Sequence, residues 1–360
     1  MEIKTTAVSA NRLTARENVQ FLQEGDIIVP DNKPDIEKIL RTSGNVVIDS
    51  TNIADGRLNY RGHIALDCLY LSKGENKKLH TMSKDIEIND FIAISGIEEN
   101  MSPKLKCTIE NIDTGILNER KINYKISGNA FADVNEVVEI NAVSSIDDLS
   151  ENQQKLTTIK TTKNICSKTE KINIKEEVAI PPTKLPIDEI ISIEPTLLNT
   201  EAVPSQDSVK ISGDITASML YTSNESSVPE VFDIDIPFDG MIETEDVEPN
   251  MEINTDLTIT DFYYDVSEDE NGENRIVNLE FVINACIEAY ATQENEILED
   301  AYSVNNNITM ENETLCYDRE VCRNKSQCPV KDMVSIDNDC PAMLQIIKAV
   351  GTPYIDVISI

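Results

Sequence analysis

The sequence contains few residues in patterns that could carry out catalysis. Its two histidines are His63, in a strand-like segment, and His80, in a lysine-rich segment, and either could serve as a general base. Neither belongs to a nucleophile motif, and the sequence has no phosphate-binding loop, dinucleotide-binding glycine turn or hydrolase nucleophile elbow. The 65 acidic residues leave open a hydrolase with a carboxylate pair, but the chain has no Trp to line a sugar cleft. We therefore predict a protein that is not an enzyme and that needs no cofactor.

A second set of reactive residues is a group of four cysteines near the end of the sequence. Their spacing, C-x5-C-x5-C-x11-C, could belong to a metal site or to disulfides, but it lacks the C-x2-C pair typical of structural zinc. Because no export signal begins the sequence, we expect reduced thiols. Structural roles are therefore favoured over metal binding for Cys316, Cys322, Cys328 and Cys340.

A third candidate is the segment 267–274, SEDENGEN, which resembles a calcium-binding loop. Ser267, Asp269 and Asn271 fall where an EF-hand places its first three ligands. The first position lacks a carboxylate, however, and Asn278 stands where a bidentate Glu is required. Because the flanks alternate like strands and an Asn-Gly pair favours a tight turn, we predict a β-hairpin here.

The most informative pattern is a fifteen-residue motif that occurs three times, at 26–40, 177–191 and 333–347. The first two copies align without a gap, so that Pro30 matches Pro181, and the register continues into the next strand-like segment. A separation of this length corresponds to a whole domain and not to a solenoid repeat. The sequence is therefore built from repeated domains.

These copies divide the chain into two full domains and the opening of another. We predict one domain at 1–150, a second at 156–310 and a third, truncated copy at 316–360. A polar stretch at 147–168 separates the first two. A chain of 360 residues is long enough for two or three domains, and each full copy is long enough to bury its own core.

The charged residues of the motif are candidates for contacting a partner, because they flank a proline-bounded turn. An alternative is that this turn, with its apolar neighbours, fixes the fold of each domain, and this alternative is favoured. The partner-binding candidates are Glu24, Asp26, Asp31, Lys33, Asp35, Lys184 and Asp188.

Most of the sequence alternates with a period of two and is rich in Ile, Val and Thr, which is typical of strands. The clearest strand segments are 19–29, 44–53, 57–71, 104–112, 121–130, 209–221, 252–264 and 275–290. Within the motif, Ile36, Ile39 and Leu40 follow the spacing of an apolar helix face, and Pro34 suits a first helical turn. The second and third copies repeat this spacing with Ile187, Ile190, Ile191 and with Met343, Ile346, Ile347. We therefore predict an all-β fold of β-sandwich-like repeated domains, with one short helix per repeat.

The charge of the chain limits its partners. With 65 acidic and 31 basic residues, the net charge is −34. Such a field repels nucleic-acid phosphates and anionic membrane surfaces, so we expect no nucleic-acid binding. A partner with a basic face is one reading, and simple solubility is the other. The sequence has no signal peptide and no apolar run of membrane-spanning length, so we predict a cytoplasmic protein without direct membrane insertion.

Two segments carry a resemblance to a known family: EGDIIVPDNKPDIEKIL, residues 24–40, and TSGNVVIDSTNIADGRLNYRGHIALDCLYL, residues 42–71. They resemble the SPOCS domain of spore-coat morphogenetic proteins of the SipL type, which are related to SpoVID. The resemblance implies a protein of the mother-cell cytosol that tethers the assembling coat to the forespore surface and binds a SpoIVA-like coat-scaffold ATPase. Many members end in a LysM module implicated in partner binding, and we expect this chain to lack one. The family implies no catalytic residues.

Two further readings of the function remain open. Self-association of the repeats is a second kind of protein contact that would suit an adaptor. A β-sandwich could also bind peptidoglycan or another carbohydrate through exposed aromatic side chains, for which the clustered candidates are Tyr263, Tyr264, Tyr290 and Tyr302.

Overall fold

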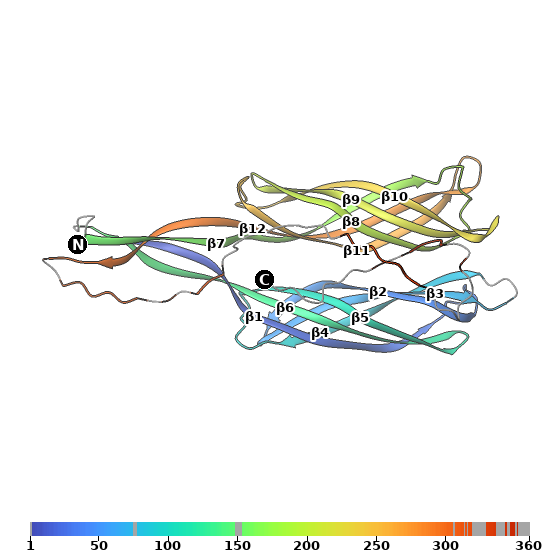
Figure 1. The fold of residues 1–360 in the computed structure, drawn as a ribbon, viewed down its shortest axis with the longest axis horizontal. Coiled ribbons are helices and arrows are strands. Elements are labelled where there is room, and N and C mark those ends of the chain that lie inside the picture. The colour runs from blue at the N-terminus through green and yellow to red at the C-terminus, as the bar shows by residue number, and fades with distance from the viewer. Residues whose placement is uncertain are drawn as a thin grey trace.

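The chain forms two similar units, each built from two three-stranded antiparallel sheets (Figure 1). The computed structural model describes residues 2–74, 78–147 and 153–304, and, beyond these, 307–312, 314, 316–318, 329–335, 343, 346–349 and 351. The first unit contains strands β1 to β6, and the second unit contains β7 to β12. The all-β class predicted from the sequence is therefore confirmed over the described part of the chain.

Both units arrange their strands in the same order. In the first unit, the sheets β1-β6-β5 and β2-β3-β4 are formed by β1 (Ile3–Ile28), β2 (Ile36–Ala54), β3 (Arg57–Ser72), β4 (Leu79–Ala93), β5 (Ser102–Asn118) and β6 (Lys121–Ile146). In the second unit, the sheets β7-β12-β11 and β8-β9-β10 are formed by β7 (Gln154–Ala179), β8 (Glu189–Ser205), β9 (Ser208–Ser223), β10 (Ser226–Glu243), β11 (Glu252–Glu268) and β12 (Asn274–Ala301). All eight segments predicted as strands fall on these elements, and only Val29, one residue past β1, lies outside them.

The central strand of each sheet supplies most of the core. Along β3, every second residue from Leu58 to Tyr70 is buried, and along β6 the same holds from Ile122 to Val134. Because side chains alternate between the two faces of a strand, this pattern places all of them on one face. The buried residues of the two sheets form a single cluster in each unit. Each unit is therefore a β-sandwich.

The prediction of a helix in the motif is wrong, because the motif leads into β2 in the first unit and into β8 in the second. β2 contains β-bulges between Ile36 and Lys38 and between Ile39 and Arg41, where two of its residues oppose one of β3. The extra residue shifts the alternation, so Ile36 and Ile39 both face the core although they are three apart. Leu40 is exposed. A bulged strand thus reproduces the spacing of a helix face.

The second copy repeats this arrangement. Ile187, Ile190 and Ile191 are all buried, and β8 carries a bulge between Ile190 and Ser192. In the third copy, Met343 and Ile346 are described and lie outside regular secondary structure, whereas residues 336–342 lie outside the described part of the chain. Among the described residues, no helix has the length and apolar character needed to cross a membrane.

Two long ribbons extend from the sandwiches. The first arm joins residues 3–12 of β1 to residues 136–146 of β6, a part of β6 that β5 does not reach. The second arm joins residues 154–163 of β7 to residues 291–301 of β12, beyond the end of β11. The polar stretch between the first two copies is therefore mostly strand, beginning at Gln154.

The two arms pack against each other (Figure 1). Val8 and Ala10 of the first arm and Thr161 of the second are fully buried, although none of them belongs to a sandwich core. The backbone N–H of Asn164 donates to Oδ1 of Asn11 at 3.3 Å. The units are therefore joined by direct contacts as well as by the chain between them.

Gly62 of β3 allows a close approach of β2, and we predict that it cannot be replaced without loss of stability. A Cβ at this position would lie 2.0 Å from the carbonyl oxygen of Val47. Because this neighbour is backbone, Gly62→Ala should lower the free energy of unfolding by about 1–3 kcal/mol, as measured by urea denaturation. Gly351→Ala is the matched control, since no atom lies within 4 Å of its Cβ position. Equal stability of the two variants would contradict the prediction.

Candidate functional site

In the first two copies, the repeated motif forms the loop that carries the chain from the first sheet of the unit to the second. This motif loop consists of residues 29–35 between β1 and β2 in the first unit, and of residues 180–188 between β7 and β8 in the second. Both loops close through a lysine N–H that donates to the carbonyl oxygen of the proline three residues earlier, at 2.9 Å in each. The two copies of the motif therefore fold in the same way.

One arginine holds the first motif loop in place. Arg120, in the turn between β5 and β6, donates through Nη2 to the carbonyl oxygens of Val29 and Pro30 at 3.0 and 2.9 Å. Its Nη1 donates to the carbonyl oxygen of Lys33 at 3.1 Å and to Oδ1 of Asp35 at 2.9 Å. A planar guanidinium group carries five donors, so one side chain can satisfy several carbonyl groups that have no strand neighbour.

Arg275 has the same role in the second unit. Its Nη1 donates to the carbonyl oxygens of Lys184 and Pro181, at 2.7 and 3.3 Å. Sequence reasoning missed both arginines. The available signal was that each stands at the end of a corresponding hairpin turn, directly before or within the last strand of its unit.

A tyrosine reaches each motif loop from the opposite sheet. Tyr70 Oη donates to the carbonyl oxygen of Pro34 at 3.1 Å, and Tyr221 Oη donates to that of Leu185 at 3.0 Å. Burial, assisted by the negative charge of Glu189, raises the pKa of Tyr70 to about 12. Burial also raises the pKa of Tyr221. Both phenols therefore stay protonated and keep donating over a wide pH range.

Two of the predicted binding residues, Lys33 and Asp188, lie in the seam, the surface along which the first and second units contact each other. Lys33 Nζ is 2.9 Å from Glu189 Oε1, and His80 Nδ1 is 2.8 Å from Glu189 Oε2. Lys78 Nζ is 3.3 Å from Asp188 Oδ2. These motif charges therefore pair the two units with each other.

A more deeply buried pair closes the seam near the arms. Lys104 Nζ of β5 donates to Glu288 Oε2 of β12 at 2.5 Å, and Tyr290 Oη donates to the same oxygen at 2.9 Å. Glu288 is only 9% exposed. Burial alone would lower the pKa of Lys104, but the hydrogen bond and the charge of Glu288 outweigh it and raise that pKa. A buried carboxylate of this kind is stable only while it is paired.

The other predicted residues make ion pairs within their own unit and are not gathered into one cluster. These pairs are Glu24–Lys125 at 2.9 Å, Asp26–Lys121 at 2.6 Å, Asp31–Arg120 at 3.6 Å, Asp35–Arg120 at 2.9 Å and Lys184–Glu230 at 3.0 Å. Exposed pairs of this type contribute little to stability. Asp31 is fully exposed at the tip of the first motif loop.

The two histidines lie at separate places in the first unit. His63 Nδ1 lies 3.7 Å from Asp49 Oδ2, while His80 is held in the seam. Cys316 is exposed. Its three predicted neighbours, Cys322, Cys328 and Cys340, lie outside the described residues. Within the described ranges, no group of three or more His, Cys, Asp or Glu side chains is arranged to hold a metal ion.

The predicted hairpin at 267–274 is confirmed. Asp269 Oδ1 accepts the backbone N–H groups of Asn271 and Glu273 at 2.8 and 3.1 Å, which holds the pKa of that carboxyl below its usual range. Gly272 adopts a positive φ of 79°, which glycine accepts without strain. The carboxylate that resembled a calcium ligand thus stabilises the turn.

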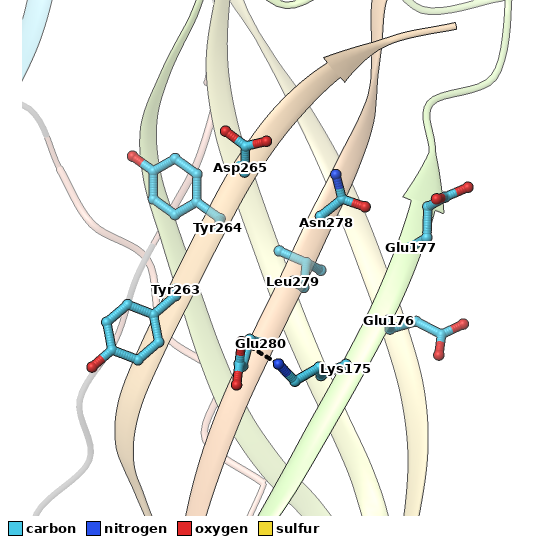
Figure 2. A pocket seen from close by; sticks show the side chains of 9 residues that line it. All are labelled: Lys175, Glu176, Glu177, Tyr263, Tyr264, Asp265, Asn278, Leu279 and Glu280. Carbon is cyan, nitrogen blue, oxygen red and sulfur yellow. Dashed lines mark hydrogen bonds and ion pairs between the residues drawn. The ribbon is translucent and has the colours of Figure 1, made fainter.

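Tyr263 and Tyr264 border a shallow hollow on the sheet β7-β12-β11 (Figure 2). Both rings extend from β11 and are 60% and 45% exposed. The ion pair Lys175–Glu280, 2.9 Å long, lies beside Tyr263. Exposed aromatic rings and polar groups therefore adjoin at this part of the surface.

The other two tyrosines considered for carbohydrate binding are elsewhere. Tyr290 Oη donates a hydrogen bond to Glu288 in the seam. Tyr302 follows the end of β12, and twelve extended residues place it about 40 Å from Tyr290. The structure therefore does not assemble the four tyrosines into one platform.

Comparison with known families gives one result, and it falls on both units. A family model described as "SipL, SPOCS domain" matches residues 35–117 and again residues 186–267. The two matches begin inside the two motif loops and cover equivalent strands, β2 to β5 and β8 to β11. No curated protein and no solved structure matches the chain.

We predict that the first motif loop depends on Arg120. Arg120→Ala leaves the partly buried carbonyl groups of Val29 and Lys33 without this donor, so the free energy of unfolding should fall by about 1–2 kcal/mol. Arg120→Lys should recover only part of this loss, because an ammonium group cannot bridge the same acceptors. Chemical denaturation measures the free energy of unfolding of both variants. The control is Arg61→Ala, which removes an exposed arginine of β3. A loss no larger than that of the control would refute the role of Arg120.

The raised pKa of Tyr70 predicts a loss of stability at high pH. Its folded-state pKa of about 12 lies above the unfolded value of about 10, so the folded protein holds this proton longer. Stability should therefore fall as pH rises from about 10 to 12. Tyr70→Phe should reduce the slope in this window without abolishing it, since Tyr60 also has a pKa of about 12. Denaturation at a series of pH values measures the slope, and exposed Tyr302→Phe should leave it unchanged.

Proposed function

Because this chain is a SPOCS-domain protein of the SipL type, we propose that it acts in sporulation as a non-enzymatic assembly protein. It helps to localise the coat at the forespore surface through protein–protein contacts. The observation that carries the proposal is that the two family matches fall on the same four strands of the two units. Membership of this family suggests a sporulation-related role, and the adaptor function is the finer part of our proposal.

The partner that we propose is a SpoIVA-like coat-scaffold ATPase, met on the mother-cell side of the forespore surface. A net charge of −34 favours a partner that presents a basic face, because complementary potentials speed association and suppress wrong partners. The same charge makes two copies of this chain repel each other. A different protein is therefore a better partner than a second copy.

Asp31 is the predicted binding residue best placed to contact that partner. It lies at the tip of the first motif loop, and Arg120 Nη2 is 3.6 Å away. Lys33 and Asp188 are instead engaged in the seam. A substitution at Asp31 can therefore test binding without disturbing the contacts between the units.

A second candidate function is the binding of peptidoglycan or another carbohydrate, and the exposure of Tyr263 favours it. Its ring offers an amphipathic face, and Lys175 and Glu280 beside it could bond to sugar hydroxyls. Retention of the chain on insoluble cortex peptidoglycan, with loss in Tyr263→Ala, would support this function. Passage of the wild-type chain without retention would reject it.

We predict that Asp31→Lys weakens binding to the purified coat-scaffold ATPase about tenfold, because it reverses a charge that faces a basic partner. Glu270→Lys makes the same charge change at the tip of the β11–β12 hairpin and should bind like the wild type. Equilibrium binding gives the affinities, and thermal unfolding checks that both variants are folded. An unchanged affinity of Asp31→Lys would remove the motif loop from the contact, whereas no binding by the wild type would reject the partner itself.

A further inference from the structure

The chain reaches the seam between the units at the end of the third copy of the motif. Residues 346–349, which include the last two residues of that copy, lie in the dark red part of the chain, between the two sandwiches (Figure 1). Lys348 Nζ is 3.2 Å from Glu194 Oε2 and donates to the carbonyl oxygen of Ser218 at 3.0 Å. The side chain of Lys348 is only 13% exposed. This lysine is therefore directed onto β8 and β9 of the second unit and away from solvent.

The first unit binds the same carboxylate. Arg41 Nη1 of β2 donates to Glu194 Oε1 at 2.7 Å. Arg41 and Lys348 occupy the same position of the repeat, two residues after the matching Ile39 and Ile346. Equivalent positions of the first and third copies thus each supply a cation to one carboxylate of the second copy.

This arrangement differs from an ordinary surface ion pair. Burial alone would raise the pKa of Glu194, but the hydrogen bonds and charges of Arg41 and Lys348 outweigh it and lower that pKa. A largely buried ammonium group is costly unless it is paired, and removal of one partner leaves the other charge uncompensated. Removal of the Lys348 charge should therefore destabilise the chain more than removal of the charge of an exposed lysine.

A second contact of the same part of the chain is independent of Glu194. The backbone N–H of Asp318 donates to the carbonyl oxygen of Asn11 in the first arm, at 2.9 Å. Tyr317 Oη donates to the carbonyl oxygen of Lys160 in the second arm, at 3.3 Å. Residues after the second unit therefore touch both units at two separate places.

We propose that Lys348, the residue that directly follows the third motif copy, docks in the seam and acts as a clasp that fixes the two SPOCS units relative to each other by sharing Glu194 with Arg41. Without this clasp, Arg41 alone bridges the units at Glu194. The orientation of the units then depends on a segment that follows them in the sequence. This inference concerns the architecture of the chain and does not rest on the proposed partner.

The test is Lys348→Met in the full 360-residue chain, because Met retains most of the side-chain volume and removes the charge. The thermal unfolding midpoint should fall by about 2–4 °C, and the radius of gyration from small-angle X-ray scattering should increase as the units separate. Lys348→Arg should restore both values. Lys331→Met, at an exposed lysine of the same part of the chain, is the matched control and should behave like the wild type.

Glu194→Gln provides a second variant that keeps the side-chain shape and should loosen the units in the same way. If Lys348→Met fails to fold by circular dichroism, the scattering of Glu194→Gln decides. In the double variant Arg41→Met with Lys348→Met, the loss in midpoint should differ from the sum of the single losses, because both cations share one acceptor. A scattering curve and midpoint of Lys348→Met equal to those of Lys331→Met, or strict additivity, would overturn the proposal.

Discussion

Each unit depends on the crossing from one sheet to the other, which an arginine holds from one side and a tyrosine from the other. In a sandwich with this strand order the chain crosses between the two sheets twice, and the motif loop is the first of these crossings. The carbonyl groups of that crossing have no strand neighbour and need other donors. Arg120 supplies them from the sheet β1-β6-β5, and Tyr70 from the sheet β2-β3-β4. The motif loop is therefore bound to both sheets, and these contacts help to fix the position of one sheet relative to the other.

The motif loops also contribute to the contact between the units, through Lys33 and Asp188. In a strongly acidic chain, contact between two units is opposed by their mutual repulsion. The seam overcomes this by setting cations of the first unit, Lys33, Lys78 and Lys104, against carboxylates of the second. Interfaces of paired charges specify register and partner more than they add affinity. In these ion pairs the first unit supplies the cation and the second unit supplies the carboxylate.

Alternation and turn residues in the sequence predict the strands that bury one face. They fail where the local structure depends on contacts with residues far away in the sequence. β3 and β9 are evident from alternation, and the hairpin before β12 from its Asn-Gly pair. The helix was wrong because a bulge puts Ile36 and Ile39 on one face, which requires knowledge of the partner strand. The first part of β7 is polar because it belongs to an arm with little core face. Arg120 could not be assigned to the motif loop, since the contact joins residues about ninety positions apart.

Shared contacts between the copies change what a repeated protein can do. Domains on a flexible linker sample many orientations, whereas repeats that contact their neighbours behave as a single stack. Arg41, Glu194 and Lys348 join three successive copies at one point, so the orientation of one copy constrains the next. The surfaces of the two units, including the tip of the first motif loop at Asp31, are then held at a defined orientation to each other. The residues that follow each copy of the motif therefore constrain how the units are oriented, whereas the motif loops join the two sheets within each unit.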